Sequence, residues 1–251
     1  MHLPDFIIGG APRSGTTWLY WMLDRHPDIY MARPVTPEPK FFLVDQVYQK
    51  GLKFYAETWF AANGDVRLAG EKTTNYLESA VAAERIARDL GRPKLIFILR
   101  EPADRAYSNY LWSRMNGLET EDLQTALRLE EQRENELPER LRFARPFSYF
   151  SRGLYADLLA PYFDRFPREQ ILILRFEDIG ARAESLAQRL HRFLGVSPRP
   201  DDARGDLVIN PSEKNGATFD EGIRRELRAR YAEPNRRLAA MLGPDFEMWQ
   251  E

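Results

Sequence analysis

The fold is decided by residues 6–18, which read FIIGGAPRSGTTW. The apolar residues at the start have the composition of a buried strand. A glycine-bearing loop follows, and an apolar helical pattern begins directly after it. A loop between a strand and a helix N-terminus binds anions, because backbone N–H groups converge on its centre and the helix dipole adds positive potential. The stretch therefore predicts a phosphate-binding loop after the first strand.

Short apolar runs alternate with longer helical patterns along the rest of the chain. The runs cover residues 94–99 and 170–174, with a weaker candidate strand at 67–71. Continuous apolar strands are typical of a parallel sheet that is buried on both faces. Helical patterns are expected at about 15–26, 76–90, 101–116, 153–166, 182–194 and 220–241. This order predicts an α/β fold that is P-loop-like and three-layered, with a central parallel sheet flanked by helices.

We expect one domain over residues 1–251, because no repeat or low-complexity linker divides the chain. Residues 119–150 are charged and then aromatic, and they are expected to form an inserted helix and loop. This insertion is either a solvated excursion or a lid over a binding site.

The composition limits the classes of function. Hydrophobic residues make up 43% of the 251 residues, which is enough apolar surface for a large core. The net charge is −2, so the electrostatic footprint of a general nucleic-acid binder is missing and no nucleic-acid partner is expected. The chain has no cysteine, and its three histidines are far apart in the sequence. We therefore expect no metal site.

The N-terminal residues lack the basic and long apolar regions of a signal peptide. No run approaches the ~18 uninterrupted apolar residues of a membrane helix. We expect a cytoplasmic protein without membrane insertion, and the sequence carries no signal for an oligomeric state.

The loop differs from the P-loop of nucleoside triphosphatases at the position of the conserved lysine of that motif. Its spacing from Gly10 matches G-x-x-x-x-G-K-[ST], but Thr16 stands where the lysine that reaches the β- and γ-phosphates is expected. The next long apolar strand ends in Arg100, where an Asp would help to hold Mg²⁺. The sequence thus predicts a nucleotide site that does not need the metal.

Residues 12–18 resemble the 5′-phosphosulfate loop of sulfotransferases that use 3′-phosphoadenosine 5′-phosphosulfate (PAPS). Residues 95–110 are similar to the family's 3′-phosphate motif, in which a strand-terminal Arg and a Ser eight residues later clamp that phosphate. Arg100 and Ser108 have this spacing, and an Arg offers a phosphate a planar fork of donors. The helix between them is expected to begin near Pro102.

The resemblance extends over nearly the whole chain and is strongest to the heparan-sulfate and carbohydrate type of sulfotransferase. It implies PAPS as co-substrate, 3′-phosphoadenosine 5′-phosphate (PAP) as product, and no required metal. The implied cofactor contacts are Arg13, Ser14, Gly15, Thr16 and Thr17 for the 5′-phosphate, and Arg100 and Ser108 for the 3′-phosphate.

Two further groups of cofactor contacts are candidates. Trp18 either stacks on adenine, as the equivalent Trp does in cytosolic members, or packs in the core. The C-terminal part departs from the secreted members, which carry a cysteine pair and a loop that closes over the cofactor. The nearest stretch here supplies Lys214, Asn215 and Gly216.

The candidate catalytic residues are Glu38, Lys72 and Arg13. Residues 37–42 (PEPKFF) resemble the segment that carries the catalytic Glu of the heparan-sulfate group, so Glu38 is the candidate general base. A neighbouring lysine, Lys40 or Lys72, is expected to hold it ionised. The alternative is an exposed loop carboxylate between two prolines.

Residues 71–76 resemble the same group's Glu-Lys-Ser/Thr-Pro-x-Tyr segment, with Thr74 in place of Pro. Lys72 is therefore expected to reach the sulfuryl group or an acidic acceptor, and the alternative is a structural ion pair with Glu71 or another carboxylate. Arg13 is the candidate that stabilises negative charge on the leaving oxygen.

Two other features have structural interpretations. Histidine is the base in the cytosolic branch, but His26 lies at the end of the first helix, where capping or packing is expected. The Arg-rich helix at about 220–241 is interpreted as a solvated face, because glutamates interleave with its arginines. An anionic acceptor groove is the alternative.

The predicted function is sulfuryl transfer from PAPS to an acceptor hydroxyl or amine of a carbohydrate or small metabolite, with residues 119–150 as a candidate acceptor element. A Mg²⁺-dependent P-loop kinase is one alternative, which the missing lysine and Asp argue against. A catalytically silent nucleotide-binding protein of the same fold is another, which Glu38 and Lys72 beside an intact loop argue against.

Overall fold

The computed structural model describes residues 2–61, 64, 66–203 and 218–249. The chain divides into two compact units. The first unit comprises residues 1–99 and 160–209, and the second comprises residues 100–159 and 210–251. The expectation of a single domain stays a prediction.

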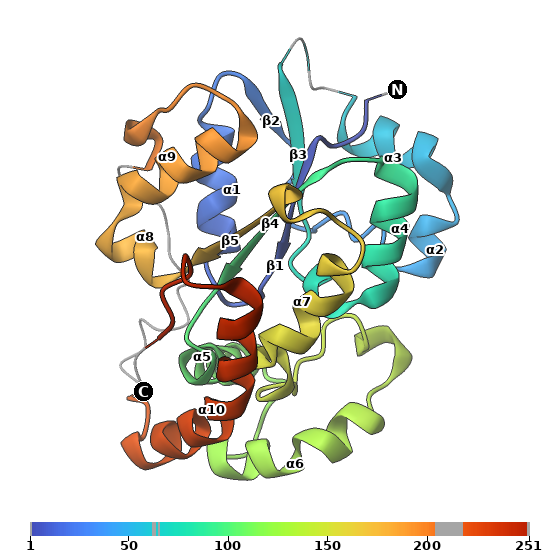
Figure 1. The fold of residues 1–251 in the computed structure, drawn as a ribbon. Coiled ribbons are helices and arrows are strands. Elements are labelled where there is room, and N and C mark those ends of the chain that lie inside the picture. The colour runs from blue at the N-terminus through green and yellow to red at the C-terminus, as the bar shows by residue number, and fades with distance from the viewer. Residues whose placement is uncertain (1, 62–63, 65, 204–217, 250–251) are drawn as a thin grey trace. The chain divides into compact units, whose positions relative to one another are not determined.

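The first unit is built on a five-stranded sheet with the order β2-β3-β1-β4-β5 (Figure 1). The strands are β1 (Phe6–Gly10), β2 (Ile29–Met31), β3 (Leu68–Lys72), β4 (Lys94–Leu99) and β5 (Ile171–Arg175). Every pairing is parallel, and Ile8 of the central β1 lies opposite Lys72 on one side and Ile96 on the other. The predicted parallel sheet is confirmed.

Helices cover both faces of this sheet, which confirms the predicted three layers. The first helix, α1 (Thr16–Asp24), and α9 (Ala183–Leu194) lie on one side, and α4 (Ala80–Leu90) lies on the other (Figure 1). The other α-helices among the described residues of this unit are α2 (Asp45–Tyr48), α3 (Gly51–Trp59), α8 (Glu177–Ala181) and the end of α7 (Tyr155–Phe163). In the part of the chain that the structure describes, no helix has the length and apolarity needed to span a membrane.

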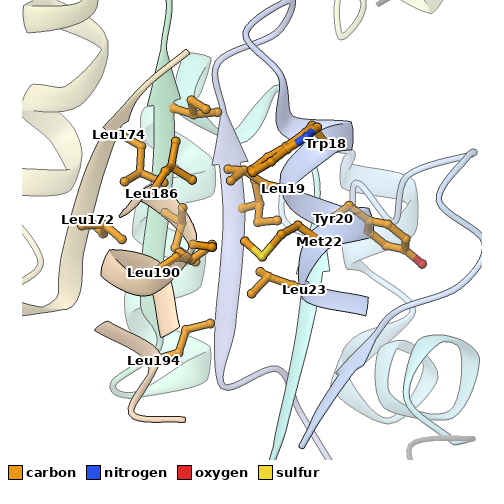
Figure 2. Close-up of a cluster of buried hydrophobic side chains, with 14 of the residues drawn as sticks. Trp18, Leu19, Tyr20, Met22, Leu23, Leu172, Leu174, Leu186, Leu190 and Leu194 are labelled. Carbon is orange, nitrogen blue, oxygen red and sulfur yellow. The ribbon is translucent and has the colours of Figure 1, made fainter. Parts of the chain in front are cut away.

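The core on the α1 side explains why the strands are apolar without alternation. Figure 2 shows Leu19 and Leu23 of α1 pointing toward Leu190 of α9, with Leu172 and Leu174 of β5 in the same cluster. The strand residues on this face alternate with residues that are equally buried toward α4, because successive side chains of a strand point to opposite faces. Both faces therefore need apolar side chains.

The second unit is helical. It contains α5 (Pro102–Met115), α6 (Leu123–Asn135), the start of α7, and α10 (Glu221–Leu242). The carboxylate of Glu101 accepts a hydrogen bond of 2.7 Å from the N–H of Asp104 and caps α5, whose first residue is Pro102 as predicted. Residues 119–150 contain α6 and a following short 3₁₀ turn, Glu139–Leu141, and their role as an insertion beside the acceptor site stays a prediction.

The arginines of α10 are largely used inside the second unit. Arg224 pairs with Asp104 at 3.2 Å, and Arg228 lies 3.7 Å from Glu101. The guanidinium of Arg230 lies over a phenyl ring, 4.1 Å from its centroid. These contacts favour a structural helix face over a groove for an anionic acceptor.

Candidate functional site

The loop between β1 and α1 has the conformation of an anion site. Gly10 (φ 155°), Arg13 (φ 67°) and Gly15 (φ 86°) all have positive φ. A Cβ on Gly10 would lie 2.9 Å from the carbonyl oxygen of Thr74, and one on Gly15 would lie 2.6 Å from Ile179. Both positions therefore require glycine. Among the described residues, no side chain caps α1 at Gly15, and uncapped N–H groups at a helix N-terminus can bind an anion.

The side chains assigned to the 5′-phosphate differ in exposure. Ser14 is fully buried and Thr16 is 5% exposed, whereas Thr17 is exposed and Arg13 is half-buried. Their contact with a phosphate stays a prediction. Trp18 is only 3% exposed and packs in the core on the α1 face of the sheet (Figure 2). This placement favours the core interpretation of Trp18, and its stacking on adenine stays a prediction.

Glu38 and Lys72 form an ion pair at the carboxyl edge of the sheet. Lys72 ends β3, and its Nζ donates a hydrogen bond to Oε1 of Glu38. The side chains are 5% and 13% exposed, so the pair is largely withdrawn from water while the carboxylate keeps some access. The partner of Lys72 is thus Glu38 and not the adjacent Glu71. Of the two lysines expected beside Glu38, Lys72 is the one that makes the ion pair.

Thr74 connects this ion pair to the loop. Its N–H donates to Oε2 of Glu38 at 3.1 Å, and its hydroxyl lies 3.2 and 3.3 Å from the two carboxylate oxygens. A Cβ on Gly10 would meet the carbonyl oxygen of Thr74 and the side chain of Leu77. Glu38 is therefore oriented by a residue that lies against Gly10 of the loop.

Lys40 adds positive charge beside the pair. Burial lowers the pKa of Lys40 below its usual value, while Glu38 opposes the shift and Lys72 adds to it. These electrostatic interactions place two lysines around one carboxylate at the edge of the sheet that carries the loop. In parallel α/β sheets, ligands bind at this carboxyl edge.

A second carboxyl group, that of Glu71, is fully buried and directly precedes Lys72 in β3. Burial raises the pKa of Glu71 to about 7, against hydrogen bonds from three hydroxyl groups that lower it. These groups belong to Tyr55 (2.5 Å), Thr73 (2.7 Å) and Tyr76 (3.0 Å). The motif of residues 71–76 was recognised in the sequence, but this hydrogen-bond network was not predicted. The position of Glu71 inside the motif was the only signal for it, and nothing in the sequence pointed to Tyr55.

The two residues assigned to the 3′-phosphate lie in the second unit. Arg100 directly follows β4 in the chain and is 9% exposed, and its carbonyl accepts a 2.8 Å hydrogen bond from Tyr155. Ser108 lies on α5 and is fully buried. Their joint role in binding a phosphate stays a prediction. Lys214, Asn215 and Gly216 lie outside the described residues.

Two of the three histidines, which are far apart in the sequence, lie side by side in the fold. The rings of His26 and His191 lie 5.0 Å apart, with Asp202 beside them. Backbone N–H groups of Asp28 and Arg199 donate to Nδ1 of His26 (3.1 Å) and His191 (3.2 Å) respectively. Each neutral ring therefore carries its proton on Nε2, so neither nitrogen offers a metal a free lone pair. The cluster has the features of a structural contact, and the packing expected for His26 is confirmed.

Comparison with protein families gives a match over residues 3–215 to a model described as the sulfotransferase domain. Among curated proteins, the human bifunctional heparan sulfate N-deacetylase/N-sulfotransferase 2 is 29% identical over 200 residues, which are 78% of this chain and 22% of that protein. The mouse heparan sulfate glucosamine 3-O-sulfotransferase 3A1 is 29% identical over 98% of this chain and 64% of its own. The chain thus spans about a fifth of the first relative's length.

Solved structures agree with the family match. A sulfotransferase from Alicyclobacillus acidocaldarius superposes with a TM-score of 0.79 at 26% identity, with 96% of each chain covered. The mouse sulfotransferase SULT7A1, complexed with PAP, has a TM-score of 0.58 at 17% identity over 94% of this chain and 86% of its own. The second likeness concerns the fold alone.

Proposed function

Because this chain belongs to the sulfotransferase family, we propose that it transfers a sulfuryl group from PAPS to an acceptor hydroxyl or amine, with Glu38 as general base. The observation that carries the proposal is the ion pair of Glu38 and Lys72, tied through Thr74 to the loop after β1. A carboxylate held in this way beside an anion site has the placement that a base for transfer chemistry needs.

The loop after β1 fits the 5′ end of PAPS. It offers glycines where a Cβ would collide, an uncapped helix N-terminus and the guanidinium of Arg13. We assign the 5′-phosphate to Arg13, Ser14, Gly15, Thr16 and Thr17, and the 3′-phosphate to Arg100 and Ser108. No lysine stands at Thr16 to hold a triphosphate, so the loop suits a phosphosulfate better than ATP.

PAPS supplies an activated sulfuryl group: a bond forms between sulfur and the acceptor oxygen or nitrogen, and the bond from sulfur to the 5′-phosphate breaks, leaving its electron pair on PAP. Glu38 removes the proton of the acceptor as the new bond forms. Lys72 orients Glu38 through the ion pair and brings positive charge to the reacting centre. Arg13 stabilises the negative charge that grows on the leaving oxygen.

We propose a carbohydrate as the acceptor. The support comes from the names of the relatives, which are a heparan sulfate N-sulfotransferase and a heparan sulfate glucosamine 3-O-sulfotransferase. They differ in the nucleophile, an amine in one and a hydroxyl in the other. A carboxylate base serves either, because it accepts the proton from N or O.

The proposal is tested with labelled PAPS and three acceptors: an N-deacetylated heparan-type polysaccharide, a neutral glucosamine oligosaccharide and a simple phenol. Glu38→Gln is expected to lower kcat by about 10²-fold or more while PAP binds as in the wild type. Glu57→Gln is the matched control, since Glu57 is exposed on α3 and pairs only with Lys53 at 3.8 Å among the contacts described. Unchanged kcat in Glu38→Gln contradicts the base role, and PAP binding without transfer to any acceptor favours the silent-protein alternative.

A further inference from the structure

We propose that Glu71 is a positioning residue, whose buried carboxylate acts through Thr73 and Tyr76 to hold the segment that carries Glu38 against Lys72. The inference rests on the proposed function, because it assigns a role in the same reaction. It is independent of the identity of the acceptor.

The first connection runs through Thr73. The backbone N–H of Lys40 donates to Oγ1 of Thr73 at 3.1 Å, and the Thr73 hydroxyl donates to Oε2 of Glu71 at 2.7 Å. The amide hydrogen has a fixed direction, so the hydroxyl must accept there and send its own hydrogen to the carboxylate. The backbone two residues after Glu38 is therefore linked to Glu71.

The second connection runs through Tyr76. The N–H of Phe42 donates to the Tyr76 hydroxyl at 3.2 Å, and this hydroxyl donates to Oε1 of Glu71 at 3.0 Å. The same logic fixes the direction of the hydrogen bonds. Through these two hydroxyls, Glu71 is linked to two backbone N–H groups of one short segment, those of Lys40 and Phe42, two and four residues after Glu38.

The carboxylate form of Glu71 suits this arrangement. Its third donor is the hydroxyl of Tyr55, at 2.5 Å from Oε1, so three hydroxyl hydrogens converge on two oxygens. An ionised carboxylate is an acceptor only and satisfies all three donors, whereas an amide would turn an N–H group toward one of them. All of these groups are almost completely buried, so water cannot replace a lost bond.

The ion pair itself needs this support. Lys72 follows Glu71 on β3 and is fixed by the sheet, where it lies opposite Ile8. Glu38 instead lies between β2 and α2 in an irregular segment that is not itself part of a strand or helix. The hydroxyl links to Glu71 therefore bring the irregular segment to the same strand that carries Lys72. Loss of a link displaces Glu38 while the phosphate loop keeps its own contacts.

The test compares Thr73→Val, Thr73→Ser and Glu71→Gln in the full chain. Thr73→Val keeps the shape but removes the hydroxyl, and it is expected to lower kcat at least tenfold with the Kd of PAP unchanged within twofold. Thr73→Ser restores the hydroxyl and is expected to stay within threefold of the wild type. Tyr55→Phe is the matched control, because the Tyr55 hydroxyl also binds Glu71 but has no described hydrogen bond to residues 37–42.

A double-mutant cycle separates positioning from general support of the fold. If Glu71 acts through Thr73, Glu71→Gln combined with Thr73→Val loses little more kcat than the worse single variant. The proposal would be overturned if the kcat losses of the two single variants multiply in the double variant. It would also be overturned if PAP affinity falls in parallel with kcat, or if Thr73→Val leaves kcat unchanged.

A crystal structure of Thr73→Val provides a readout that does not depend on activity. We expect Glu38 to have left Lys72 in this variant, with the loop of residues 10–17 unchanged. An intact Glu38–Lys72 contact overturns the positioning role even if the wild type transfers sulfuryl groups. A wild type that fails to transfer them overturns the proposed function and leaves this structural test standing.

Discussion

Lys72 contacts one carboxylate oxygen of Glu38, while the N–H of Thr74 contacts the other at 3.1 Å. The donors come from consecutive parts of the chain, the end of β3 and the turn that follows it. A side chain from an irregular segment is thereby oriented by the central sheet. The relationship joins a candidate base to the strand next to the phosphate loop, and it is the basis for the catalytic assignment.

Replacement of Lys72 by Ala is expected to lower kcat by about 10²-fold, because Glu38 loses the cation that orients it and the reacting centre loses a positive charge. PAP should bind with nearly unchanged affinity in calorimetry. Lys53→Ala is the control, since Lys53 is exposed on α3. A kcat like that of the wild type would remove Lys72 from the mechanism.

The collision at Gly15 predicts a difference between two glycines that share the left-handed backbone conformation. Gly15 and Gly195 have φ values of 86° and 80° and ψ values of 14° and 24°. A Cβ would be 2.6 Å from Ile179 at Gly15, whereas at Gly195 it would only reach van der Waals contact with Nζ of Lys94 at 3.9 Å. Gly195→Ala should cost about 1 kcal/mol of unfolding free energy from backbone strain alone. Gly15→Ala should cost more and should also weaken PAP. Equal losses in urea unfolding would show that the loop tolerates a side chain.

Arg100 is expected to recognise the phosphate on the ribose. Arg100→Ala should weaken PAP by roughly 10- to 100-fold, the range for a charged hydrogen bond, and should hardly affect adenosine 5′-phosphate. Arg114→Ala on the exposed face of α5 serves as the control. A similar loss for both nucleotides would place Arg100 away from the 3′-phosphate.

His191 predicts a pH dependence of stability. Burial, helped by neighbouring His26 and opposed by Asp202, lowers the pKa of His191 from 6.5 to about 4. The unfolded chain then takes up a proton between pH 6.5 and 4 that the folded chain does not. The free energy of unfolding should therefore fall as the pH drops through this window, by up to roughly 1 to 3 kcal/mol from this group.

Urea unfolding between pH 7.5 and 4 measures this effect. His191→Asn should flatten the slope, and His2→Asn, a change at a surface histidine, should keep it. If the His191 variant retains the slope of the wild type, the ring is already charged in the folded protein or another group is responsible.

The fold was predictable where the signal is local. The strand, loop and helix of residues 6–24 are confirmed. They were predictable because the apolar runs mark the strand and the helix, and the glycines mark the turn of the loop. The edge strand β2 was missed because Ile29–Met31 is too short to show a period. The helices α2 and α3 were missed because their sequences mix aromatic, charged and glycine residues without a clear apolar stripe. The cytoplasmic location stays a prediction.

The site was predictable only as far as motifs reach. Glu38 and Lys72 were identified as candidates, but their pairing depends on how the segment after β2 folds back to β3. The contact of Tyr55 with Glu71 and that of His26 with His191 join distant parts of the chain, and one sequence carries no record of such contacts. Trp18 could be read as either core or cofactor contact, because both uses bury an aromatic ring.

The most direct test of the account is calorimetric titration of the full chain with PAP and with ATP, each with and without Mg²⁺. We predict that PAP binds without the metal and that ATP binds at least tenfold more weakly. Arg13→Ala should lose most of the PAP affinity, while Arg189→Ala on the exposed face of α9 should keep it. Tighter, Mg²⁺-dependent binding of ATP would contradict the account.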